Sequence, residues 1–321
     1  MLGFPSVDRA LAVRPDWFLN VGNEEYDLLS DELAAGDSAA EFDIAWAHGK
    51  RFLESAHGLR GRVPDRVEWQ GPGRPPGYDQ IPADLRVDHV YLISCKYGSD
   101  ILFNVSPSHV FDRLLAERRG DRTDWFLEIA PEAYQDLYQR SVASTGLNAM
   151  PDNAMPECVS ELDGESRLRL KDALPKRGTW PDDLTSPYRD FVNAVSVATA
   201  HRWKDNLVDK ADQELMLWRL LRFQPAPYFV LGASSDGTPL GFRVGTPSDF
   251  RQQFSIRAFD VWADAMGQPM VRWRAELQGA RRPIEGHIEV RWSRGRFGGV
   301  PEAKVYLDTP HHDVANYTPI E

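Results

Sequence analysis

The feature that most restricts the fold is the pattern of the last third of the sequence, from residue 227 onward. Six runs there are apolar or alternate between apolar and polar residues, and turn signals such as Ser-Asp-Gly and Gly-Gly separate them. The runs are PYFVLGAS, LGFRVGT, FSIRAFDVWADAMG, MVRWRAELQG, HIEVRWSRGRF and AKVYLDT. This succession predicts an antiparallel β meander.

Helical patterns dominate the chain before this point. Apolar residues recur at three- and four-residue spacing in 38–58, and residues 124–140 and 188–223 also have helical character. Ser106 followed by Pro107 is typical of a helix start. We therefore expect a mixed α+β fold with a peripheral segment at 1–36, a helix-rich region at 37–225 and an antiparallel β region at 226–321. The β region could belong to the same domain as the helices, and 141–187, rich in proline, is expected to be loop.

Composition narrows the class of protein. No apolar run approaches the roughly 20 residues that span a bilayer, and the N-terminal residues lack the basic region and apolar block of a secretory signal. The two cysteines offer neither a disulfide framework nor a metal-ligand spacing. A cytoplasmic location without a membrane partner is expected. The net charge is −11, and residues 1–200 hold 21 Lys+Arg against 33 Asp+Glu. The whole molecule is therefore not expected to wrap nucleic acid, but the charge distribution leaves room for a local basic face.

An apolar strand that ends on a lysine is the most informative local feature. In the run DHVYLISCKYGSD, residues 90–93 should be buried, and the strand continues through Ser94 and Cys95 to Lys96. Lysine is rare here, with 7 Lys against 30 Arg. A lysine at this place therefore indicates a need for a compact, movable ammonium group.

Together with the preceding IPADLRV, this strand resembles the PD-(D/E)xK nuclease superfamily, the fold of many restriction and repair endonucleases. In that family a helix with a Glu precedes a strand with an Asp, and the next strand ends on (Asp/Glu)-x-Lys. The resemblance covers roughly residues 38–118. It implies a restriction-endonuclease-like core in which Glu41 is the helix carboxylate and Lys96 the lysine, while Ser94 stands where the family usually has an acid.

The chemistry explains this combination of residues. Mg²⁺ (or Mn²⁺) held by carboxylates stabilises charge and activates a water, and a nearby lysine can orient that water. Glu41 and either Asp84 or Asp88 would hold the metal. Asp84 lies beside Ser94 if the strands form a hairpin: a two-residue turn at 88–89 would place Val87 opposite Val90, whereas a longer turn would place Asp84 opposite Ser94 itself. Asp88 needs a kink in the chain instead, and both acids remain candidates.

Two further groups of residues lie in the C-terminal half. Glu289 followed by Glu302 and Lys304 forms a rival site with the same spacing across a Gly-Gly hairpin. On the strands 271–277 and 288–294, the arginines alternate with apolar residues. These arginines could contact phosphates, or they could form cross-strand pairs with glutamates on a solvated face. The candidate phosphate contacts are Arg272, Arg274, Arg291 and Arg294.

The function expected from these patterns is that of a Mg²⁺-dependent endonuclease acting on DNA, in restriction or anti-phage defence. The alternative is a non-catalytic, nuclease-like subunit that binds a partner or senses a signal in a defence complex. A homodimer is compatible with both. The missing acid at Ser94 and the acidic N-terminal half favour the alternative.

Overall fold

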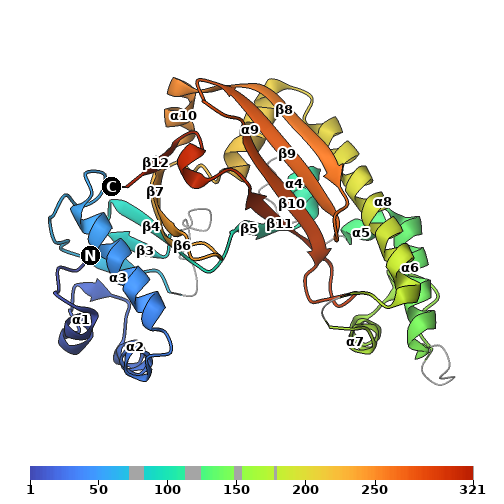
Figure 1. Ribbon diagram of the computed structural model, residues 1–321, viewed down its shortest axis with the longest axis horizontal. Helices are drawn as coiled ribbons and strands as arrows, with labels where there is room; N and C mark the ends of the chain where they lie inside the picture. Colours follow the sequence, from blue (N-terminus) through green and yellow to red (C-terminus); the bar gives the residue numbers. More distant parts are fainter. Residues whose placement is uncertain (72–82, 113–123, 148–153, 177–178, 321) are drawn as a thin grey trace. The chain divides into compact units, whose positions relative to one another are not determined.

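The structure, a computed structural model, describes residues 1–71, 83–112, 124–147, 154–176 and 179–320. It is a mixed α+β protein with two sheets, and the chain divides into two compact units (Figure 1). Unit 1 comprises Met1–Asp100, Arg222–Phe254 and Pro310–Glu321, and unit 2 comprises Ile101–Leu221 and Ser255–Thr309. The units interleave along the chain, so neither coincides with the contiguous ranges 37–225 and 226–321.

Unit 1 is built on a mixed sheet with the strand order β1-β2-β3-β4-β6-β7-β12. The strands β2, β3 and β4 are antiparallel neighbours, and β4 then pairs in parallel with β6. The strand predicted near 90–96 is confirmed, and a further short strand lies at Val67–Trp69. The bounds are β1 (Phe18–Leu19), β2 (Val67–Trp69), β3 (Leu85–Val87), β4 (Tyr91–Tyr97), β6 (Tyr228–Ala233), β7 (Pro239–Val244) and β12 (Tyr317–Pro319).

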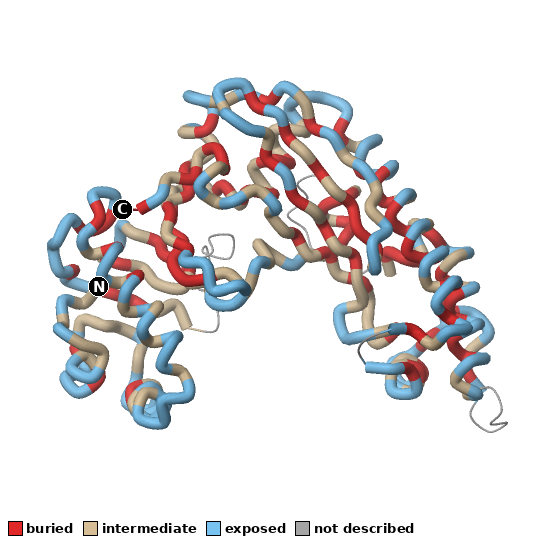
Figure 2. The backbone as a smooth tube through the Cα atoms, viewed as in Figure 1, coloured by how far each residue is buried: buried red, intermediate tan, exposed pale blue. Residues whose placement is uncertain are grey.

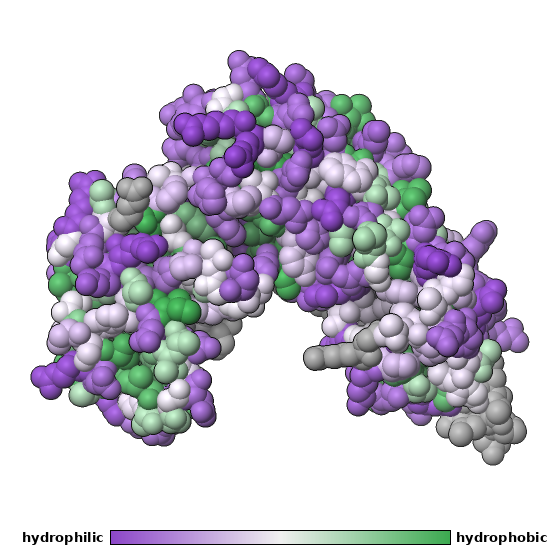
Figure 3. Space-filling model, viewed as in Figure 1, coloured by the Kyte–Doolittle hydropathy of each residue, from purple (hydrophilic) through white to green (hydrophobic). Residues whose placement is uncertain are grey.

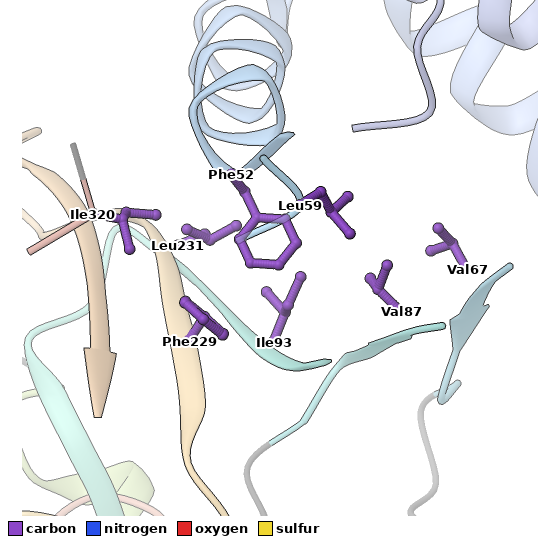
Figure 4. Close-up of a cluster of buried hydrophobic side chains, with 8 residues drawn as sticks. All are labelled: Phe52, Leu59, Val67, Val87, Ile93, Phe229, Leu231 and Ile320. Carbon is purple, nitrogen blue, oxygen red and sulfur yellow. The ribbon is translucent and has the colours of Figure 1, made fainter. Parts of the chain in front are cut away.

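One face of this sheet is covered by helix α3 (Ala39–Glu54), which confirms the helix expected in 38–58. Phe52, near the end of α3, is fully buried and lies against strands β4 and β6 (Figure 4). Its ring meets that of Phe229 edge to face at 4.9 Å, a geometry that adds to the gain from burial. The core cluster consists of Phe52, Leu59, Val67, Val87, Ile93, Phe229, Leu231 and Ile320.

The N-terminal segment differs from the irregular structure expected for residues 1–36. It forms helices α1 (Val7–Val13) and α2 (Asn23–Ala35). Capping explains these helices better than apolar periodicity does: Ser6 accepts a hydrogen bond from the first turn of α1, and Gly36 ends α2 in the left-handed conformation. Apolar side chains gather on the surface over α1 and α2 (Figure 3), and Val13, Leu28 and Leu29 are exposed.

Unit 2 contains an antiparallel sheet with the order β5-β11-β10-β9-β8. The strands β8, β9, β10 and β11 pair successively, which confirms the C-terminal meander, although β6 and β7 belong to the other sheet. Alternation along β9 buries Val271, Trp273 and Ala275 and leaves Arg272 and Arg274, which lie between them, on the opposite face. The bounds are β5 (Ile101–Val105), β8 (Ser255–Asp264), β9 (Met270–Gln278), β10 (Ile284–Trp292) and β11 (Pro301–Leu307).

Helices cover the apolar face of this second sheet. The longest, α8, packs against β8 and β9, and Trp203 on α8 contacts Phe259 on β8. Buried positions lie in the strands of both sheets and along one side of α8 (Figure 2). The bounds are α4 (Pro107–Phe111), α5 (Trp125–Ile129), α6 (Pro131–Thr145), α7 (Gly164–Ala173), α8 (Asp182–Asn206) and α9 (Lys210–Leu220), with α10 (Pro247–Gln253) in unit 1.

The proline-rich stretch 141–187 is therefore not all loop. Asp163 caps α7 by accepting the Ser166 N–H at 2.8 Å, and α8 begins directly after Pro181 and continues past Pro187. Within the described part of the chain, no helix has the length and apolar character needed to cross a bilayer.

The parallel pairing of β4 with β6 brings two backbones unusually close together. Gly232 of β6 is the register partner of Lys96 and has a φ of +138°, a conformation that residues with a Cβ rarely adopt. A Cβ added to Gly232 would lie 1.7 Å from the carbonyl oxygen of Lys96. A glycine is therefore required where these strands meet.

We predict that Gly232→Ala destabilises the protein by on the order of 3 kcal/mol, because backbone strain and a steric clash with a strand add together. Gly237→Ala is the matched control. Gly237 also has a positive φ, but an added Cβ would meet nothing within 4 Å. Urea unfolding of both variants tests this: equal losses of unfolding free energy would show that the contact with Lys96 does not matter.

Candidate functional site

The hairpin between β3 and β4 decides which acid lies beside β4. Residues 88–90 form the turn, the first two with φ values of 49° and 59°, and Val87 pairs with Tyr91. The two-residue turn is therefore wrong, and the longer turn is confirmed. In this register the next pair beyond the ladder is Asp84 with Ser94, as the longer turn requires.

Asp84 is fixed against the end of β4 by two hydrogen bonds. Its carboxylate Oδ2 accepts the backbone N–H of Cys95 at 2.6 Å, and its own N–H donates to the carbonyl of Ile93 at 2.7 Å. Ser94 is buried and Lys96 half-buried. The structure thus brings Asp84 into the neighbourhood of the Ser94-Cys95-Lys96 run.

Alternation along β4 defines which face of the sheet these side chains occupy. Ile93 belongs to the core beneath α3, and Cys95 packs against that core. Because successive side chains point to opposite faces, Ser94 and Lys96 lie on the face away from α3. Ser94 and Lys96 lie on the same strand as the core residue Ile93, but their side chains do not pack in that core.

Glu41 is not brought to this face. It is exposed in the first turn of α3, where a carboxylate is favoured by the helix dipole. Helix α3 covers the opposite face, and Glu41 precedes the core residue Phe52 by about 16 Å of helix axis. The family pattern, in which this helix supplies a metal ligand, is not reproduced in the geometry of the described residues.

Asp88 has a different setting from Asp84. Its carboxylate accepts hydrogen bonds from Arg62 at 2.7 Å and from the backbone N–H groups of Asp65 and Arg66 at 2.8 and 3.0 Å. It ties the hairpin turn to the loop before β2, at the end of β4 opposite to Lys96. Of the two acids left open by the sequence, the structure places Asp84 beside the lysine strand and Asp88 at the far end.

A buried carboxylate on β2 was missed by the sequence reasoning. Glu68 is 7% exposed, and its side chain accepts a short hydrogen bond from Arg86, its register partner on β3. The Arg86 guanidinium lowers the pKa of Glu68 by this bond, more than burial raises it. By alternation Glu68 and Asp84 share one face of the sheet as diagonal neighbours, about 7–8 Å apart. The acid between Val67 and Trp69 was the available signal.

A nucleophilic role for the Ser94-Cys95 pair is not supported. Burial, and secondarily the charge of Asp84, raises the pKa of Cys95 to about 12, so its thiol stays protonated at neutral pH. The histidine that could have served as a base, His89, lies in the hairpin turn and approaches Glu68 and Arg66 instead.

The rival residues of the C-terminal sheet form a ladder of ion pairs. Glu289 is the register partner of Lys304, and Lys304 contacts Glu302 at 3.2 Å. The Glu289 carboxylate also approaches Arg291 at 3.4 Å and accepts a hydrogen bond from Tyr306 at 3.1 Å. Each acid of this group is therefore already engaged by a cation or a hydroxyl.

The arginines of β9 are paired in the same way. Arg272 contacts Asp264 at 2.5 Å and Asp308 at 3.1 Å, and these bonds raise its pKa further, the bond to Asp264 contributing most. Arg274 contacts Glu276 at 3.1 Å and Glu285 at 3.7 Å. Cross-strand pairing, the alternative considered from the sequence, describes Arg272 and Arg274, whereas Arg291 pairs with Glu289 on its own strand and Arg294 is exposed in the loop after β10. Phosphate binding by these residues remains a prediction.

Among the residues that the structure describes, no group of three or more His, Cys, Asp or Glu side chains converges as a metal site. The face of β2, β3 and β4 offers Asp84 and Glu68 as carboxylates and Lys96 as an ammonium group. Mg²⁺ is commonly held by one or two carboxylates, with waters and substrate phosphates completing its shell. The donor set at this face is compatible with that mode and too small for a closed protein cage.

Comparison with known proteins found no match: no family model, no curated protein and no solved structure matches the chain.

Proposed function

We propose that this chain is a Mg²⁺-dependent endonuclease that cleaves DNA in the cytoplasm, in restriction or anti-phage defence. The observation that carries the proposal is the position of Asp84 beside β4, the strand that carries Lys96, where the Asp84 carboxylate accepts a hydrogen bond from the Cys95 N–H. The chain order also supports it: helix α3 precedes the hairpin of β3 and β4, Asp84 comes directly before β3, and β4 carries Ser94-x-Lys96.

The residues of this face have complementary roles in the proposed reaction. Asp84 would hold the metal, which supplies stabilisation of phosphate charge and an acidified water. Lys96 would orient that water or stabilise negative charge on the phosphate. Glu68, rather than Glu41, is the second carboxylate on the same face of the sheet, although it is bonded to Arg86. The hydrogen bond from Cys95 fixes the orientation of Asp84.

A second candidate function is a non-catalytic, nuclease-like subunit of a defence complex that binds a partner protein or a second copy of the chain. Ser94 favours it. Its hydroxyl is buried directly opposite Asp84, at the position where the resembled family usually has an acid. A neutral hydroxyl contributes no charge to a metal site, so this candidate predicts no metal-dependent cleavage by the wild-type protein.

The first test is Lys96→Ala. If the proposal holds, the variant should lose Mg²⁺-dependent cleavage of duplex DNA by on the order of 100-fold or more, because a charge that stabilises the transition state is removed. Its melting temperature should change little, since Lys96 lies outside the core cluster.

Lys50→Ala, at an exposed position of α3, is the control and should cleave like the wild type. Plasmid relaxation with Mg²⁺, and with EDTA as a blank, is the measurement. Unchanged cleavage by the Lys96 variant would remove this lysine from the mechanism, and absence of cleavage by the wild type would favour the second candidate.

The second test is Ser94→Asp. This change places a buried carboxylate opposite Asp84, so without metal we expect a loss of about 1–3 kcal/mol of unfolding free energy from like-charge repulsion and desolvation. If the face binds a cation, Mg²⁺ should restore much of this loss, and cleavage should be kept or raised.

Ser94→Asn is the matched control, because it has nearly the same shape and no charge. Thermal melts of both variants with and without Mg²⁺ distinguish the outcomes. A melting temperature of the aspartate variant that Mg²⁺ leaves unchanged would contradict any metal at this face.

A further inference from the structure

The loop between β10 and β11 carries cations in a setting unlike that of the strand arginines. Its sequence, Ser-Arg-Gly-Arg-Phe-Gly-Gly, spans residues 293–299, and helix α7 lies beside it (Figure 1). Arg294 and Arg296 come from the loop, and Lys171 comes from the last turn of α7. Loop and helix both belong to unit 2.

Glycines let the stems of two of these side chains pass close to the turn. A Cβ added to Gly299 would lie 3.5 Å from Cγ of Arg294, and one added to Gly298 would lie 2.8 Å from Cδ of Lys171. The stem of Lys171 also passes 3.6 Å from the corresponding position at Gly295. Larger residues in the loop would displace the lysine, so the glycines keep Lys171 lying across the turn beside Arg294.

The loop is anchored by contacts with other residues of unit 2. Phe297 is fully buried and stacks on Tyr134, and its carbonyl accepts a hydrogen bond from Arg167 at 3.2 Å. Arg296 lies over the ring of Trp180 at 4.1 Å and donates to the carbonyl of Pro175 at 3.0 Å. The cations are therefore presented by an anchored turn.

Arg294 and Lys171 differ from Arg272 and Arg274 in their partners. The strand arginines are each bonded to two acids, whereas Arg294 and Lys171 have no ion pair or hydrogen bond with any residue described by the structure. Both side chains carry a positive charge on the same glycine turn, and neither is neutralised by a described acid. An anion bound at this turn would therefore be attracted by two unpaired cations.

We propose that Arg294 and Lys171, with the glycine turn between them, bind the phosphodiester backbone of duplex DNA. The inference rests on the proposed function for its choice of polyanion and deepens it by assigning a substrate contact. Arginine and lysine are the usual phosphate contacts, and a turn of glycines permits close approach of a backbone. The phosphate-contact role expected for β9 thus passes to the loop.

The test is a salt titration of binding with a fluorescein-labelled 20-base-pair duplex. All proteins carry Lys96→Ala, so that cleavage does not interfere. The double variant Arg294→Gln with Lys171→Gln should lower the slope of log affinity against log salt by about 1.8, which is two contacts at roughly 0.9 each. Between 50 and 200 mM salt, the parent should lose roughly 10-fold more affinity than this variant.

The matched control is Arg272→Gln with Arg274→Gln, which removes the same formal charge from the paired strand face. It should leave the slope nearly unchanged. The proposal is overturned if the loop variant binds with the parent's affinity and slope, if the control alone changes the slope, or if the parent does not bind the duplex at all. If the loop variant loses binding but the wild type cleaves no DNA, the proposed nuclease function is rejected and the proposed DNA contact of the loop is kept.

Discussion

The parallel pairing of β4 with β6 is the interaction on which the rest of unit 1 depends. It joins residues 91–97 to residues 228–233, with most of unit 2 inserted between them. Such a long closure is tolerated because the entropic cost of closing a loop rises only slowly with its length. The contact also puts Lys96 against Gly232, so the strand that carries the candidate site is fixed by a position that admits no side chain. Fold and site thus share one constraint.

Local pattern predicted the elements well where apolar residues form a continuous run or recur with a regular period. The strand near 90–96 follows from the apolar run at 90–93, and the helix over 38–58 and the meander of β8 to β11 follow from periodic apolar residues. Helices α1, α2 and α7 were missed because their caps, and not their apolar residues, mark them. Pairing between segments that are distant in the chain could not be predicted from the sequence. The apolar run 228–233 fits either sheet, so nothing in it indicates that this strand pairs with β4 and not with the meander.

The residues of the candidate site also divide into those that local sequence could place and those that depend on tertiary packing. Asp84 could be placed opposite Ser94 from the length of the hairpin turn, once a longer turn was allowed, because register is a local property. The sequence alone could not exclude Glu41 from the candidate site, because tertiary packing decides which face of a sheet a helix covers. Glu68 was hidden for another reason: an acid inside a three-residue strand has no periodicity to reveal it, and only its pairing with Arg86 explains its burial.

The unequal use of arginine and lysine follows from what each side chain does in the structure. Arg272 contacts Asp264 on β8 and Asp308 just after β11, and Arg274 contacts Glu276 on β9 and Glu285 on β10, which a planar guanidinium with several donors permits. Lysine is a single compact charge on a flexible stem. The stem of Lys171 passes beside Gly298, and Lys96 is half-buried on the strand that pairs with β6. The charges of Arg272 and Arg274 are partly neutralised by acids, which weakens their attraction for a phosphate, whereas Lys171 and Arg294 have no such partner among the described residues. The strand arginines thus join neighbouring segments of unit 2, and the two unpaired cations of the glycine loop are the better candidates for a contact with a polyanion.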